Sequence, residues 1–229
     1  IWLTGMILIP VAGSQIISRF LLRGHDGQWK QWLRQAADFV LGVSPILFMS
    51  LVTFEVLVLV FDLAVETAAI GVVGVTLCAG VTGSFVAMTP FVKAIQLSSS
   101  RLKAPVRFVQ ITDVHIGSRS KSFLDRVVTR INLEKPDFVC ITGDFVDATG
   151  VPESDLIALK SIVGPIYYCI GNHEKYEDLD EILARLDNLG VNILRDRSMM
   201  HRSDIQVIGI DDMEDPFQVE KQLEYIELV

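Results

Sequence analysis

Five polar residues suited to metal chemistry fall into three short motifs in the second half of the chain. ITDVHIG carries Asp113 and His115, ITGDFVD carries Asp144, and IGNHE carries Asn172 and His173. Carboxylates, imidazoles and amide carbonyls are ligands for hard to borderline divalent ions such as Mn, Fe, Zn or Mg. Two such ions about 3.5–4 Å apart that share a carboxylate can hold a hydroxide nucleophile and polarise a phosphoryl group. Asp144, in the middle motif, would be the shared ligand.

Each motif follows an apolar, β-prone run, and helical patterns separate the runs. The predicted strands are 106–112, 137–142 and 166–170, with shorter β-like runs at 191–194 and 205–210, and the predicted helices are 122–134, 153–163 and 179–189. This alternation predicts an α/β domain with βαβ units. Ligands of such sheets collect outside the carboxyl ends of the strands, so we expect the three motifs to meet at one edge. Any one motif alone is weak evidence, because a single Asp after a strand is often a turn or cap residue.

The order DxH, GD and GNH(E) resembles the calcineurin-like metallophosphoesterase superfamily, from about residue 106 to the end of the sequence. The resemblance implies an α/β domain in which a β-sheet sandwich is flanked by helices. It also implies that Asp113 and His115 bind the first metal, that Asp144 bridges both metals, and that Asn172 binds the second. His173 would not be a ligand. It would contact the scissile phosphate, where it would stabilise charge or protonate the leaving group.

The sequence departs from the family pattern in its later histidines. The family has a lone metal His and a GHxH motif downstream, and neither occurs up to Val229. His201, the only later histidine, lies ahead of the predicted strand at 205–210, and we expect it to be a surface residue. Since the sequence starts at Ile1, inside an apolar run, we expect a fragment whose phosphoesterase domain is incomplete at the C-terminus.

The first part of the chain is strongly apolar. Residues 1–92 hold 4 of the 20 Lys and Arg residues and 5 of the 28 Asp and Glu residues. Three stretches, 1–17, 39–61 and 68–88, are long enough or nearly long enough to cross a bilayer as helices. The predicted organisation is a transmembrane helical region at 1–92, a linker at 93–105 and a metallophosphoesterase domain at 106–229.

Charges around these stretches predict an orientation. Basic residues lie between the first two stretches and after the third, whereas Asp62 and Glu66 lie between the second and third. Lys and Arg favour the cytoplasmic side, which predicts an integral protein of a bacterial inner or plasma membrane with a cytoplasmic catalytic domain. The formal net charge of −8 argues against nucleic acid as a partner. The expected partners are the lipid bilayer and a phosphoester substrate.

Two functions follow from this reading. The chain resembles the bacterial branch of the family with an N-terminal hydrophobic region and a GNHE loop, which implies a membrane-anchored phosphoesterase. It would hydrolyse a phosphodiester or pyrophosphate bond, in a lipid-linked or a soluble substrate, through two divalent metal ions and a metal-bound hydroxide. The alternative is a membrane sensor or transport component whose cytoplasmic domain binds metal or phosphoryl groups without turnover. Glu55, a carboxylate inside the second apolar stretch, favours this alternative.

Some polar residues near the motifs have two possible roles. Asp147 either orients a metal ligand or serves as a turn residue. Glu174 and Tyr176 either line the substrate pocket or are exposed residues at a helix start, and we expect the second. Asp211 and Asp212 follow another predicted strand and are not expected to bind metal. The three cysteines, at 78, 140 and 169, form no CxxC pair, and we expect them to be reduced.

Overall fold

The computed structural model describes residue 13 and residues 28–212, and the chain divides into two compact units, Ile1–Phe91 and Val92–Val229. Each unit is described here by itself. The predicted first apolar stretch, residues 1–17, lies outside the described residues apart from Gly13. The three-part domain division therefore stays a prediction.

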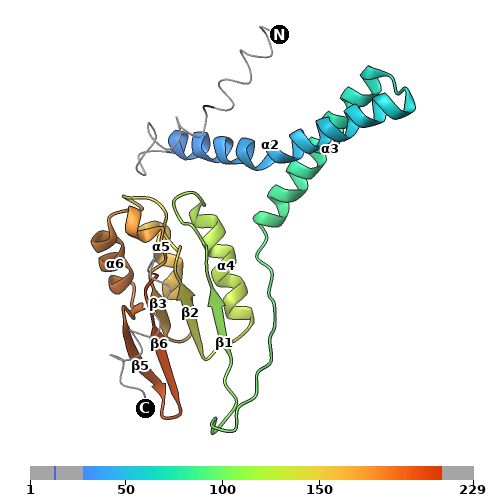
Figure 1. The fold of residues 1–229 in the computed structure, drawn as a ribbon. Helices are drawn as coiled ribbons and strands as arrows, with labels where there is room; N and C mark the ends of the chain where they lie inside the picture. Colours follow the sequence, from blue (N-terminus) through green and yellow to red (C-terminus); the bar gives the residue numbers. More distant parts are fainter. Residues whose placement is uncertain (1–12, 14–27, 213–229) are drawn as a thin grey trace. The chain divides into compact units, whose positions relative to one another are not determined.

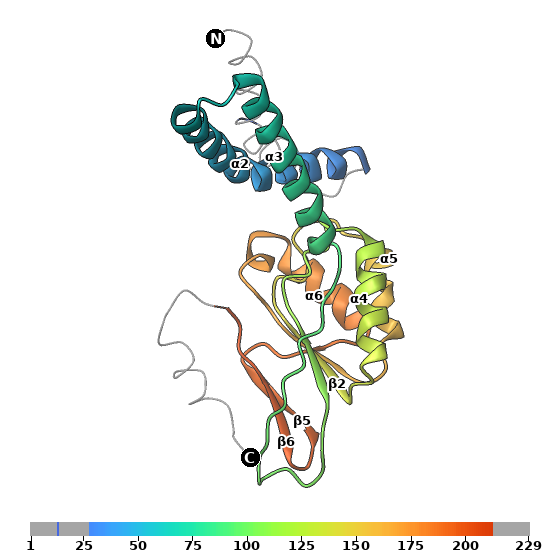
Figure 2. The same ribbon diagram turned by 90° about the vertical axis from the view of Figure 1, so that its right-hand side faces the viewer.

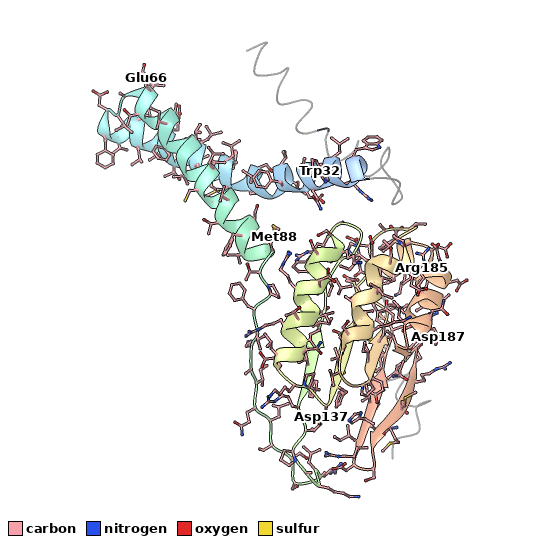
Figure 3. All side chains as sticks on the ribbon, turned by 180° about the vertical axis from the view of Figure 1, so that it is seen from behind. Trp32, Glu66, Met88, Asp137, Arg185 and Asp187 are labelled. Atoms are coloured by element: carbon pink, nitrogen blue, oxygen red, sulfur yellow. The ribbon has the colours of Figure 1, made fainter. Side chains whose placement is uncertain are left out.

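Two long helices, α2 (Gln28–Phe61) and α3 (Val65–Ala87), make up the described part of the first unit (Figure 1). Figure 3 labels Trp32 near the start of α2, and Glu66 and Met88 near the two ends of α3. A Cβ at Gly80 of α3 would lie 3.1 Å from the Phe39 and Val43 side chains of α2, so this glycine lets the helices approach closely. The buried positions of α3 recur every four residues, at Ala68, Val72, Thr76 and Gly80.

Both helices are long and apolar enough to cross a membrane. Trp32–Phe61 has a mean hydropathy of 2.3 and Val65–Ala87 one of 1.9, and only 6% and 17% of an 18-residue apolar window in each is buried. The core helix of a soluble protein would be mostly buried, so these two exposed apolar helices are candidate membrane spans by length and composition.

The second unit is built on a parallel sheet with strand order β1-β2-β3-β4. Its strands are β1 (Phe108–Ile111), β2 (Phe138–Thr142), β3 (Ile166–Cys169) and β4 (Asn192–Ile193). The crossovers contain α4 (Lys121–Leu133), α5 (Glu153–Leu156) continued by the 3₁₀ turn η1 (Ile157–Ser161), and α6 (Leu179–Asn188), with the short turn η2 (Glu174–Tyr176) before α6. The α/β alternation predicted from the sequence is confirmed.

The sheet lies between helices and a β-hairpin. Figure 2 shows α4 and α5 on one side of the sheet and the antiparallel pair β5 (Arg197–Arg202) and β6 (Ile205–Gly209) on the other. Helix α4 buries one apolar face in the main core: Phe123, Leu124, Val127, Val128 and Ile131. The hairpin side has a smaller core in which Ile205 and Val207 pack against Phe138 and Tyr167. The two strand layers flanked by helices agree with the expected architecture.

Three local details differ from the sequence prediction. The helix expected at 153–163 forms only one α-turn and then tightens into a 3₁₀ turn. Strand β5 was not predicted, because its sequence RSMMHR lacks the apolar alternation of a half-buried strand, and it forms through its pairing with β6. His201, expected at the surface, lies on β5 and is half-buried, with its ring 4.5 Å from that of Phe138.

The amino ends of β1 and β2 are tied together by Asp137, which Figure 3 labels. The Asp137 carboxylate accepts the Arg107 backbone N–H at 2.7 Å, and the Asp137 N–H donates to the Arg107 carbonyl at 2.7 Å. This fixes the register of the two strands, so their carboxyl ends, where the three motifs begin, lie at the same level.

Candidate metal centre

The three polar motifs meet at the carboxyl edge of the sheet, as the sequence predicts. Asp113 follows β1, Asp144 follows β2 and His173 follows β3. The first two loops continue to pair beyond their strands, since the Asp113 N–H donates to the Gly143 carbonyl at 3.3 Å and the His115 N–H to the Asp144 carbonyl at 3.0 Å. Backbone pairing therefore holds the DxH and GD motifs side by side.

Three residues of these loops have a left-handed backbone, which is uncommon outside glycine. Their φ angles are 56° at Asp113, 54° at His115 and 51° at Asp144. Such conformations cost on the order of 1 kcal/mol each and cluster where function requires a particular side-chain direction. The strained positions here are three of the residues that the sequence proposes as metal ligands.

The side chains of the three motifs bring metal-binding atoms close together. One ligand atom each from His115, Asp144 and His173 lies within 4.8 Å of the other two. Asp113 joins them, with its Oδ1 at 3.8 Å from His115 Nε2, while its Oδ2 accepts the Thr112 hydroxyl at 2.7 Å. Carboxylates and imidazoles are the groups that bind divalent ions such as Zn, so this cluster is a candidate metal site.

His115 is oriented by a second carboxylate on its far side. Its Nδ1 lies 3.2 Å from Asp147 Oδ2, and Asp147 Oδ1 accepts the Ser118 N–H at 2.8 Å. The hydrogen bond to Asp147 raises the pKa of His115 against the opposing effect of burial, and the charges of Asp147, Asp144 and Asp113 add to it. Burial alone would raise the pKa of Asp147, but the hydrogen bonds from His115 and Ser118 lower it overall. With Nδ1 bound to Asp147, Nε2 faces Asp113 as the available ligand atom.

Comparison with known proteins agrees with this geometry. Residues 106–217 match the calcineurin-like phosphoesterase family. This chain carries a calcineurin-like metallophosphoesterase domain. The matched family is one of phosphoester hydrolases.

Relatives of the metallophosphoesterase domain occur in bacteria and animals. The chain is 34% identical over 102 residues to an uncharacterised metallophosphoesterase from Campylobacter jejuni, covering 43% of this chain and 27% of the relative. It is 32% identical over 128 residues to one from Helicobacter pylori, covering 54% and 34%. A transmembrane protein with a metallophosphoesterase domain from Danio rerio is 29% identical over 126 residues, covering 48% and 28%. The chain thus spans about a third or less of the length of these relatives. No solved structure shows a significant match.

Two glycines of the metallophosphoesterase domain let the GD and GNH loops touch. A Cβ at Gly143 would lie 2.5 Å from the backbone of Gly171, and one at Gly171 would lie 2.6 Å from the Asp144 nitrogen. The His173 N–H also donates to Asp144 Oδ1 at 3.0 Å. Only glycine leaves room for this contact, which places His173 beside Asp144.

Glu174 differs from the expectation drawn from its sequence position. We expected an exposed helix-start residue, but Glu174 is fully buried, and its carboxylate accepts backbone N–H groups from both neighbouring loops. The hydroxyl of Tyr168 lies buried nearby, and burial followed by the charge of Glu174 raises the pKa of Tyr168. The sequence did not predict that Glu174 is buried and binds both loops. The one available signal was general: an acid that is buried needs hydrogen-bond partners.

The remaining candidates are Asn172, Tyr176, Asp211 and Asp212. Asn172 is exposed on the loop after β3, and Tyr176 is exposed on η2, as expected for Tyr176. Asp211 is buried, and its Oδ2 accepts a hydrogen bond from Arg195 Nε at 2.7 Å. The Asp212 N–H donates to the Ile170 carbonyl at 3.1 Å and so holds the segment after β6 against β3.

Proposed function

We propose that this chain belongs to a membrane-anchored, metal-dependent phosphoesterase that hydrolyses a phosphodiester or pyrophosphate bond at a two-metal centre. The observation that carries the proposal is the convergence of Asp113, His115, Asp144 and His173 at the carboxyl edge of one parallel sheet. The membership of this domain in a phosphoesterase family supports the choice of reaction.

The proposed ligand set follows the three motifs. Asp113 and His115 would hold one ion, Asp144 would bridge, and Asn172 would hold the second. A pair of divalent ions supplies Lewis-acid polarisation of the phosphoryl group and a water of lowered pKa. The chain itself aims the ligands: Thr112 holds Asp113, Asp147 holds His115, and the His173 backbone holds Asp144. The oxygen-rich donor set is compatible with Mn, Fe, Zn or Mg.

His173 is proposed to contact the phosphoryl group. Its exposed ring stands edge-on to the ring of His115 with centroids 4.7 Å apart, which brings it to the open side of the cluster. From there it can stabilise developing charge or protonate the leaving oxygen, a role typically worth about 10²–10⁴ in rate. This role separates His173 from the ligands, because its loss should leave metal binding intact.

The substrate and its location follow from the apolar helices. A membrane tether would keep the catalytic domain near lipid-linked phosphoesters, so a lipid phosphodiester or pyrophosphate is the proposed substrate class. The basic residues on either side of the two apolar helices support a cytoplasmic domain at a bacterial inner membrane.

The deciding experiment is hydrolysis of bis(p-nitrophenyl) phosphate by the full-length protein, stripped of metal and then given Mn, Mg, Zn or Fe one at a time. We expect turnover that requires metal, is lost with metal binding in Asp144→Asn, and is lost with metal binding retained in His173→Ala. Metal binding without turnover of this or any lipid phosphoester would instead support the sensor or transport function, for which the exposed Glu55 on α2 is the supporting feature.

A further inference from the structure

We infer that Glu174 is a positioning residue of the metal centre: its buried carboxylate fastens the GD loop to the GNH loop and thereby sets the places of Asp144 and His173. The inference rests on the proposed two-metal function and deepens it. It assigns a task to a side chain that is neither a proposed ligand nor in reach of solvent.

The contacts of Glu174 form a clamp across two loops. Its Oε2 accepts the N–H of Asp144 at 3.0 Å and that of Gly171 at 3.0 Å, so one oxygen joins the two loops. Its Oε1 accepts the N–H of Phe145 at 2.6 Å and that of Val146 at 3.2 Å. A carboxylate has about four acceptor positions, and these four donors account for all of them.

The clamp acts on the site through Asp144. The backbone of this residue is held by Glu174, while its side-chain Oδ1 accepts the N–H of His173, the residue that precedes Glu174. These bonds close a ring from the GNH loop to the GD loop and back. The left-handed conformation of Asp144 is held within this ring, which offsets its intrinsic cost.

A purely structural carboxylate would not be placed in this way. Glu174 is 0% exposed, and a buried carboxylate is costly unless donors surround it. All four donors belong to the loops that carry the proposed ligands, and one is the N–H of the proposed bridging ligand itself. Glu174→Gln would keep the side-chain volume but would turn an NH₂ group toward two backbone N–H groups. We therefore expect the loops to separate in that variant.

Glu177 offers a matched control three residues away. Its Oε2 accepts the Thr149 N–H at 2.6 Å, so it too bridges the segment after β3 to the segment after β2. Thr149 is five residues beyond Asp144 and contacts none of the proposed ligands. The change Glu177→Gln therefore removes a comparable bridge without touching the centre.

The test compares Glu174→Gln and Glu177→Gln in the full-length protein, by calorimetric titration with Mn²⁺, by kcat and KM at saturating Mn²⁺, and by Tm. Loss of a residue that orients a ligand typically costs about 10- to 100-fold in metal affinity or activity, and we expect a loss of this size for Glu174→Gln. For Glu177→Gln we expect a lower Tm with unchanged Mn²⁺ affinity. A folded Glu174→Gln protein with wild-type affinity and kcat would overturn the inference alone, whereas absence of Mn²⁺ binding in the wild type would overturn the proposed function as well.

Hydrogen exchange of the wild type keeps the test independent of how the variants fold. The clamp predicts slow exchange at the backbone N–H groups of residues 144–146 and 171, although all of them lie in loops. Exchange as fast as that of the exposed Gly150 would contradict the clamp. Slow exchange that becomes fast in Glu174→Asp, whose shorter side chain cannot reach both loops, would support it.

Discussion

The imidazole of His115 is held from behind by Asp147, with 3.2 Å between Nδ1 and Oδ2. Asp147 is itself anchored, because its other oxygen accepts the Ser118 N–H and its side chain is only 8% exposed. This pair fixes both the direction of the ring and the nitrogen that is left for a metal. The sequence left the role of Asp147 open between turn residue and orienting residue, and the geometry favours the second.

Replacing Asp147 with Asn should weaken metal binding without unfolding the domain. Asn keeps an oxygen for Ser118 but loses the charge that holds His115, so we expect about 10- to 100-fold lower Mn²⁺ affinity by calorimetric titration. Asp125→Asn is the control, since it makes the same change of charge at an exposed position of α4. Equal Mn²⁺ affinities for the two variants would show that Asp147 is only a turn residue.

Gly171→Ala should displace Asp144. The added Cβ would stand 2.2 Å from Asp144 Oδ1 and 2.6 Å from the Asp144 nitrogen. The side chain could rotate away, but the backbone nitrogen could move only if the loop shifted. Overpacking of this kind typically costs about 1–3 kcal/mol, so we expect a lower free energy of unfolding. We also expect Mn²⁺ to raise the Tm of this variant less than that of the wild type.

Thermal unfolding with and without Mn²⁺ measures this effect. The control is Gly74→Ala in α3, where the new Cβ meets nothing within 4 Å. It should leave the unfolding of the α/β unit and its stabilisation by metal unchanged. A wild-type Tm and wild-type metal stabilisation in Gly171→Ala would mean that the two loops do not approach as closely as described.

The fold was predictable where apolar runs mark the strands and polar motifs mark the ends of the strands. The runs before Asp113, Asp144 and Asn172 are apolar and β-prone, and parallel strands place their carboxyl ends together, so the meeting of the motifs followed from the pattern. Strand β5 did not follow, because pairing with β6 rather than apolar alternation creates it. The burial of Glu174 also did not follow, because an acid after GNH reads as a solvent-exposed helix start until the four backbone donors around it are known.

The thiols of the α/β unit should react slowly. Burial, with a smaller contribution from Cys169, raises the pKa of Cys140 to about 11, and burial also raises the pKa of Cys169. At pH 8 only about one Cys140 in a thousand is then a thiolate, so alkylation should be roughly a hundredfold slower than for an ordinary thiol. The rate should rise about tenfold per pH unit until pH approaches 11.

Iodoacetamide labelling followed by mass spectrometry measures these rates. The same protein in urea is the control, since unfolding removes the burial and should return both thiols to ordinary reactivity. Rapid labelling of Cys140 in the folded protein at pH 8 would contradict the burial described here.

The orientation of the α/β unit can be tested with single cysteines. We expect Ser154→Cys, at an exposed position of α5, to be protected from a membrane-impermeant thiol reagent in intact cells and labelled after permeabilisation. Glu66→Cys, exposed at the start of α3 between the two apolar helices, should react in intact cells because the acidic turn is predicted to face outward. Both variants are made with Cys78 replaced by Ser, and the slow reaction of Cys140 and Cys169 keeps the background low. The reverse pattern would place the α/β unit outside the cytoplasm and direct the search for a substrate to the other face of the membrane.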